Sequence, residues 1–174
     1  SRATGFLAYV ALWLSMVCGV LISAGTLGGR ISRRWMIDLH QEWTLAAVIA
    51  TVLHIALVVL NPEADISPWA AIIPFASARM TGSMAIGTIS TLLVTLIAVT
   101  SWARTRIPYE AWRAIHALAF GAMLLALAHS IAAGTDTTST GAQALYLATS
   151  VSLTGLIALR VLLTLAGRAR SEAS

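Results

Sequence analysis

Residues 112–130 read WRAIHALAFGAMLLALAHS, an apolar stretch that contains two histidines, His116 and His129. The other two histidines of the chain, His40 and His54, lie in a second apolar stretch, LHQEWTLAAVIATVLHIALVVL, at residues 39–60. An ionisable side chain inside a membrane-length apolar segment is costly, so its presence there indicates a functional site by default. The two pairs have nearly equal separations, thirteen and fourteen residues.

At a rise of 1.5 Å per residue, these separations place the two rings of each helix about 20 Å apart along its axis. If the two helices run in the same direction, His40 faces His116 at one membrane depth and His54 faces His129 at the other. Imidazole is the usual axial ligand of a low-spin b-type haem. The pattern therefore favours two stacked sites in which two haem b groups have these four histidines as ligands of the iron.

The composition is typical of an integral membrane protein, with 58% hydrophobic and 10% charged residues and a mean hydropathy of +0.83. A membrane-spanning helix needs about 20 apolar residues. The sequence predicts an all-α fold, a single domain over residues 1–174 with five transmembrane helices, at roughly 5–25, 36–60, 81–102, 110–133 and 142–166. The first apolar run is longer than the core of a usual signal peptide, so we expect it to be a true span.

All eleven basic residues are arginines, and they gather at alternate connections between the predicted spans. Arg2 and Arg79 fall on one side, and nine fall on the other: Arg30, Arg33, Arg34, Arg104, Arg106, Arg113, Arg160, Arg168 and Arg170. The positive-inside rule then predicts an outer N-terminus and a cytoplasmic C-terminus. We expect a multi-pass protein of the bacterial cytoplasmic membrane, in which the two histidine helices are parallel.

Some of these arginines are candidate partners of haem propionates, because a guanidinium pairs well with a carboxylate. Arg33 and Arg34 precede His40, and Arg113 precedes His116, so these three are assigned to the inner site; Arg79 is assigned to the outer one. Topology anchoring explains the same arginines equally well. The net charge of +4 does not indicate nucleic-acid binding, because every basic cluster abuts the end of a span and meets membrane lipid there.

Three further features carry expectations of their own. Residues 61–80 contain three prolines, so we expect them to lie on the outer interface and to roof the outer site. On an ideal helix thirteen residues miss the starting face by about 140°. The later histidine helix is therefore expected to be kinked or overwound, with Gly121 as a place for the irregularity, unless its two histidines approach their sites from different sides. Cys18 is expected to be a small buried hydrophobe, and the span 81–102 is assigned no chemistry.

The run TSW, a short basic turn, the stretch WRAIHALAFGAMLLALAHS and then AGTD together resemble the ferric reductase-like transmembrane domain family. This family includes the NADPH oxidases, metalloreductases and the bacterial haem subunit that serves methionine sulfoxide reductase. LHQEWTLAAVIATVLHI is similar to the other histidine helix of that family, and the resemblance covers roughly residues 30–135. It implies His40 and His116 as ligands of an inner haem, and His54 and His129 as ligands of an outer one.

The resemblance also implies transmembrane electron transfer, as an oxidoreductase component, from a cytoplasmic-side donor to an acceptor at the outer face. The chain contains no GxGxxG nucleotide-binding motif. The donor is therefore expected to be a separate flavoprotein, quinol, or a domain outside this sequence. The oxidases carry a further histidine one turn beyond the outer ligand, where this chain has Val58, so superoxide production is not expected.

Other functions stay open at this point. A quinol-oxidising cytochrome b also pairs histidines on two parallel helices, although its quinol-site loop is not visible here. A histidine-based carrier of divalent metal is less favoured, since the histidine helices lack mid-depth carboxylates and thiolates. Two further alternatives are that the chain is an assembly subunit of a larger complex and that the four histidines have a purely structural role.

Overall fold

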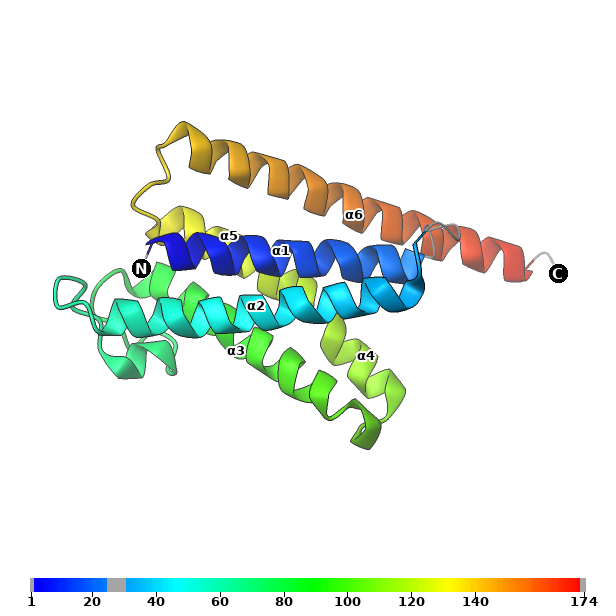
Figure 1. Cartoon of the computed structure of the whole chain (residues 1–174), viewed down its shortest axis with the longest axis horizontal. Coiled ribbons are helices and arrows are strands. Elements are labelled where there is room, and N and C mark those ends of the chain that lie inside the picture. Colours follow the sequence, from blue (N-terminus) through cyan, green and yellow to red (C-terminus); the bar gives the residue numbers. More distant parts are fainter. Residues whose placement is uncertain (1, 25–30, 173–174) are drawn as a thin grey trace.

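A computed structural model describes residues 2–24 and 31–172 of the 174-residue chain, with side chains up to residue 167. All regular elements in these ranges are helical (Figure 1). In chain order they are α1 (Arg2–Ala24), α2 (Arg33–Val59), η1 (Pro68–Ala71), α3 (Thr81–Trp102), η2 (Arg104–Arg106), α4 (Tyr109–Ala117), α5 (Ala119–Ala133) and α6 (Thr140–Glu172). Arg30, one of the basic residues used to predict the topology, lies outside the described residues.

Five segments are long and apolar enough to cross a membrane, and they correspond to the five predicted spans. They are α1, α2, α3, the α4–α5 pair taken together (Tyr109–Ala133), and the Thr140–Gly167 part of α6. Each agrees with its predicted range to within three residues at either end. The N- and C-terminal ends of the chain lie at opposite ends of the bundle in Figure 1, as an odd number of spans requires.

The bundle is built from two antiparallel helix pairs and one added helix. α1 packs along α2, and α3 packs along α5 and α4, while α6 lies against α1. A core cluster joins α1, α5 and α6 through Tyr9, Met16, Met123, Ala142, Tyr146 and Leu153. Most other apolar side chains face outward, as expected where the surrounding medium is lipid. α2 and the α4–α5 pair therefore run in the same direction, as the pairing of the histidines requires.

The later histidine helix is interrupted, as its thirteen-residue spacing predicts. The break is at Leu118, between α4 and α5, and not at Gly121 as expected. The backbone N–H of Leu118 donates to the carbonyls of Ile115 and His116, so one turn is tighter than α-helical. This tighter turn changes the angle about the helix axis between the side chains of His116 and His129. Gly121 has open space around it and needs no special conformation.

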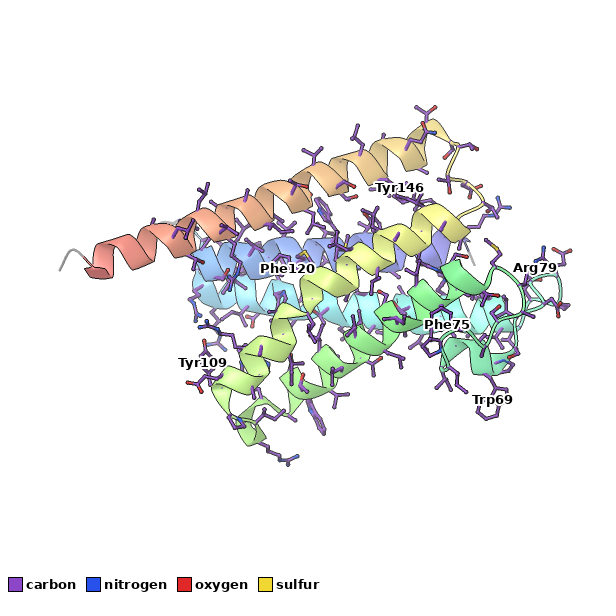
Figure 2. All side chains as sticks on the ribbon, turned by 180° about the vertical axis from the view of Figure 1, so that it is seen from behind. Trp69, Phe75, Arg79, Tyr109, Phe120 and Tyr146 are labelled. Carbon is purple, nitrogen blue, oxygen red and sulfur yellow. The ribbon has the colours of Figure 1, made fainter. Side chains whose placement is uncertain are left out.

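Residues 61–80 form a folded segment across one end of α2 and α3. Its 3-10 helix η1 is tied to α3 by the Thr88 hydroxyl, which donates to the carbonyl of Ala70 at 2.7 Å. Within this segment the side chain of Ala70 is buried, whereas those of Trp69 and Phe75 are each 67% exposed. Figure 2 shows both aromatic side chains at this end of the molecule, opposite to Tyr109 on α4. The segment is not a span, in agreement with the sequence.

Candidate functional site

The predicted inner pair is brought together. The rings of His40 on α2 and His116 on α4 have centroids 6.1 Å apart and planes inclined by 70°. Both side chains are half-buried, and their helices are separate elements of the bundle. A metal–nitrogen bond of about 2 Å on each side, plus about 1 Å from each nitrogen to its ring centre, gives about 6 Å between the centroids of two trans imidazoles. The observed centroid separation is of this size.

His40 is held in place by α1. Its Nδ1 donates to the backbone carbonyl of Ser15 at 2.7 Å. The Ser15 hydroxyl lies 3.1 Å from the same nitrogen and 2.6 Å from the hydroxyl of Thr44. Gly19, one turn further along α1, has no side chain, and a Cβ built there would lie 3.4 Å from Cε1 of His40. With Nδ1 bonded to a carbonyl, Nε2 is the nitrogen left for a metal.

His116 has a different set of partners, from α3 and from its own helix. Its Nδ1 lies 3.3 Å from the hydroxyl of Ser101. The same hydroxyl accepts a hydrogen bond of 3.3 Å from the indole nitrogen of Trp112. The Trp112 ring also stacks on His116, with centroids 5.1 Å apart and an interplanar angle of 27°. Trp112, Ser101 and His116 thus form a short chain of contacts at the inner pair.

The predicted outer pair lines a single cavity of about 500 Å³. His54 of α2 and His129 of α5 both contribute to its wall, together with parts of α1, α3 and the segment 61–80. Cavities of this volume are in the range of cofactor sites. A Cβ built on Gly5 of α1 would lie 3.0 Å from Cε1 of His54, so only glycine fits there without displacing the ring.

His129 is held by the backbone of α3. Its Nδ1 donates to the carbonyl of Ser83 on α3 at 2.8 Å. A Cβ built on Gly87 would lie 2.6 Å from the same nitrogen. The span 81–102, which was expected to carry no chemistry, therefore supplies both a hydrogen-bond acceptor and the space for this ring. Ser101, further along α3, lies at hydrogen-bond distance from His116 through its hydroxyl.

A short sequence signal accompanies these contacts. SMVCG at 15–19 and SMAIG at 83–87 share a serine and a glycine four residues apart. In both, the serine carbonyl accepts from a histidine and the glycine lies against the same ring. SRATG at 1–5 has the same spacing, and its Gly5 also lies against a histidine; Ser1 is outside the described residues. This spacing, read against the histidines, was the signal that sequence reasoning missed.

The predicted arginines divide between the sites. Arg79 lines the outer cavity with His54 and His129, and it donates to the carbonyl of Glu63 at 3.3 Å. Figure 2 places Arg79 and Tyr146 at the same end of the molecule. Arg33, Arg34 and Arg113 are exposed, and within the described ranges none of them has an ion-pair partner or a contact with a histidine. Their assignment to the inner site stays a prediction.

Two residues at the mouth of the outer cavity were not foreseen. Arg2 of α1 and Asp136 of the α5–α6 connection form an ion pair at 2.9 Å, and both line the cavity. Their side chains are 66% and 36% exposed, so the pair contributes little to stability. It connects two segments that are 134 residues apart at the opening of this cavity.

The two histidine pairs can be compared with what a bare metal ion and a haem each require. A divalent ion is usually held by three or four protein ligands, and no group of three or more His, Cys, Asp or Glu side chains that could hold one occurs in the described part of the chain. A haem needs only two axial side chains, because its macrocycle supplies the other nitrogens. The imidazoles of His40 and His129, fixed through Nδ1 to backbone carbonyls, have the orientation that second-shell bonds give to metal-binding histidines.

Comparison with known proteins adds one finding. Residues 1–136 match the model of a domain family of unknown function, DUF8596. No curated protein and no solved structure matches the chain. The matched region contains all four histidines and every helix except α6.

Proposed function

Since the chain belongs to the DUF8596 family, a domain family of unknown function, we propose its function from the site itself. It is a membrane b-type cytochrome that holds two stacked bis-histidine haems. It passes electrons across the membrane from a donor on the cytoplasmic side to an acceptor at the outer face. The inner haem is held by His40 and His116, and the outer haem by His54 and His129.

One observation carries this proposal: the four half-buried histidines lie two on α2 and two on the α4–α5 pair, which runs in the same direction as α2. His40 and His116 lie 6.1 Å apart, and His54 and His129 share one cavity. Four half-buried imidazoles cost free energy in a bundle embedded in lipid. The packing of the helices alone does not require histidines at matched depths. Two levels about 20 Å apart are suited to relay electrons across a hydrocarbon core of about 30 Å.

The residues of the chain have distinct tasks in this proposal. Ser15 and Ser83 orient His40 and His129 through their backbone carbonyls, and Ser101 orients His116. Gly5 and Gly87 leave room for the rings of His54 and His129, and Gly19 lies against the ring of His40. Arg79, at the wall of the outer cavity, is placed to neutralise an anionic group there. When bound, haem supplies the reversible one-electron chemistry of its iron, and the protein sets its position and potential.

Purified full-length protein tests the proposal directly. We expect the visible spectrum of a low-spin b haem, with two haems per chain by pyridine haemochrome assay and protein quantitation. The reduced protein should not bind carbon monoxide, because both axial positions are taken by histidine. A colourless, folded preparation would refute the proposal. Stoichiometric zinc or copper bound in place of haem would refute it as well.

A further inference from the structure

A second hollow in the molecule lies away from all four histidines. It is a groove of about 440 Å³ between α5 and the later part of α6. Among the described side chains its walls are Phe120, Ile157, Val161, Thr164 and Leu165, together with the charged Arg160. Ile157, Val161 and Leu165 recur every four residues and so form one row on α6. Phe120 forms the facing wall from α5, two residues after the break at Leu118 (Figure 2).

The position of Arg160 along α6 fixes the depth of this groove. Arg160 follows Thr140, the first residue of α6, by twenty residues, which is a rise of about 30 Å. The hydrocarbon core of a bilayer is also about 30 Å thick. Arg160 therefore lies at the headgroup level opposite to Thr140. Ile157, about 4.5 Å nearer to Thr140, lies at the depth of the acyl chains, whereas Leu165 lies about 7.5 Å beyond Arg160. This is the end of the bundle from which α2 starts.

Arg160 is held by a neutral hydroxyl. Its guanidinium donates to the hydroxyl of Ser23 on α1 at 2.5 Å, and it has no carboxylate partner among the residues that the structure describes. A guanidinium has five N–H donors in a planar fork that matches phosphate oxygens. The serine fixes one edge of this fork beside the groove. A cation at headgroup depth next to an apolar groove complements a ligand with an anionic head and an apolar tail.

We propose that this groove is a binding site for one anionic phospholipid, with its phosphate on the Arg160 guanidinium and one acyl chain along Phe120, Ile157 and Val161. The site does not depend on haem and so stands independently of the proposed electron transfer. If the arginine-rich ends face the cytoplasm, the site is in the cytoplasmic leaflet, where anionic lipids attract basic side chains. The lipid would fill the space between α6 and the bend of the α4–α5 pair.

Native mass spectrometry of the full chain tests this site. Delipidated protein is mixed with phosphatidylglycerol or with phosphatidylcholine of the same acyl chains. We expect one phosphatidylglycerol to be retained with a preference of about fivefold over phosphatidylcholine, the effect of one basic residue at an anionic surface. Arg160→Gln should abolish the preference, whereas Arg104→Gln, an exposed arginine at the same end of the bundle, should keep it.

A second variant tests the contribution of the apolar groove separately from that of the Arg160 charge. Val161→Trp fills the groove at a position that is 51% exposed and leaves Arg160 in place. Val161→Trp should weaken retention of phosphatidylglycerol without unfolding the helix. It therefore tests the lipid site even if Arg160→Gln is unstable. Equal retention of the two lipids by the wild type would overturn the proposal, and so would unchanged preference in Arg160→Gln. Displacement of the lipid by a stoichiometric isoprenoid quinone would instead assign the groove to quinone.

Discussion

Gly87 and His129 are in backbone-to-ring contact: a methyl group at Gly87 would lie 2.6 Å from Nδ1 of the imidazole. Real Cβ atoms do not approach other atoms this closely, so any larger residue must push the ring away. The same ring is fixed by the carbonyl of Ser83. The outer histidine is thus positioned by one turn of α3, and its site depends on the absence of a side chain at one position.

Gly87→Ala should therefore damage the outer site selectively. We expect the haem content to fall from two toward one per chain and the stability to fall by about 1–3 kcal/mol, the usual cost of overpacking. Haem quantitation and thermal unfolding measure the two effects. Gly82→Ala is the matched control on the same helix, because a Cβ there meets nothing within 4 Å. Equal losses in the two variants would contradict the role given to Gly87.

The histidine pairing predicts which variants empty the same site. His54→Ala and His129→Ala should each remove the outer haem, and their combination should remove no more. His40→Ala and His116→Ala should empty the inner site instead. Redox-titrated absorbance and haem content per folded chain distinguish these outcomes. The pairing is wrong if the combined His54 and His129 variant loses both haems while its helices remain folded.

Ser101 should tune the inner haem without binding it. A metal on Nε2 of His116 leaves the proton on Nδ1, which then donates to the Ser101 hydroxyl. This bond makes the imidazole more basic and favours the ferric state. Ser101→Ala should therefore raise one of the two midpoint potentials by an amount on the order of tens of millivolts, as measured by potentiometric titration.

The control for this prediction lies on α3. Thr95 donates only to the carbonyl of Thr91 in its own helix, so Thr95→Ala should leave both potentials unchanged. Trp112→Phe keeps a ring beside His116 but removes the indole donor to Ser101. It should shift the same potential as Ser101→Ala. A shift in the other potential would show that Ser101 and His116 do not belong to one site.

The orientation of the bundle can be measured with single cysteines in a Cys18→Ala background, since Cys18 is buried. Thr138 lies in the α5–α6 connection and Thr105 lies in η2, and both are exposed. The arginine distribution predicts that an impermeant maleimide added outside intact cells labels Thr138→Cys and not Thr105→Cys. The reverse labelling pattern would invert the proposed direction of electron transfer.

The sequence by itself determined the helical class, the five spans and their bounds to within a few residues. Apolar runs of about 20 residues have no other stable form in a membrane, so length and composition suffice. The need for an irregular turn between His116 and His129 also followed from helical phase alone. Its place did not, because the break at Leu118 depends on how α4 and α5 each pack on α3.

Only the tertiary structure decided which surfaces meet the histidines. That α1 and α3 supply Ser15, Gly19, Ser83 and Gly87 depends on the register of antiparallel packing between consecutive spans. Small residues are common at every helix–helix contact in membranes. The serine–glycine spacing therefore does not indicate a histidine site until the structure shows which helix packs against it. Likewise, Arg79 lines the outer cavity, whereas Arg33, Arg34 and Arg113 have no ion pair or histidine contact within the described part. A flexible side chain at a helix end can reach lipid, solvent or a cofactor, and local sequence does not distinguish these surroundings.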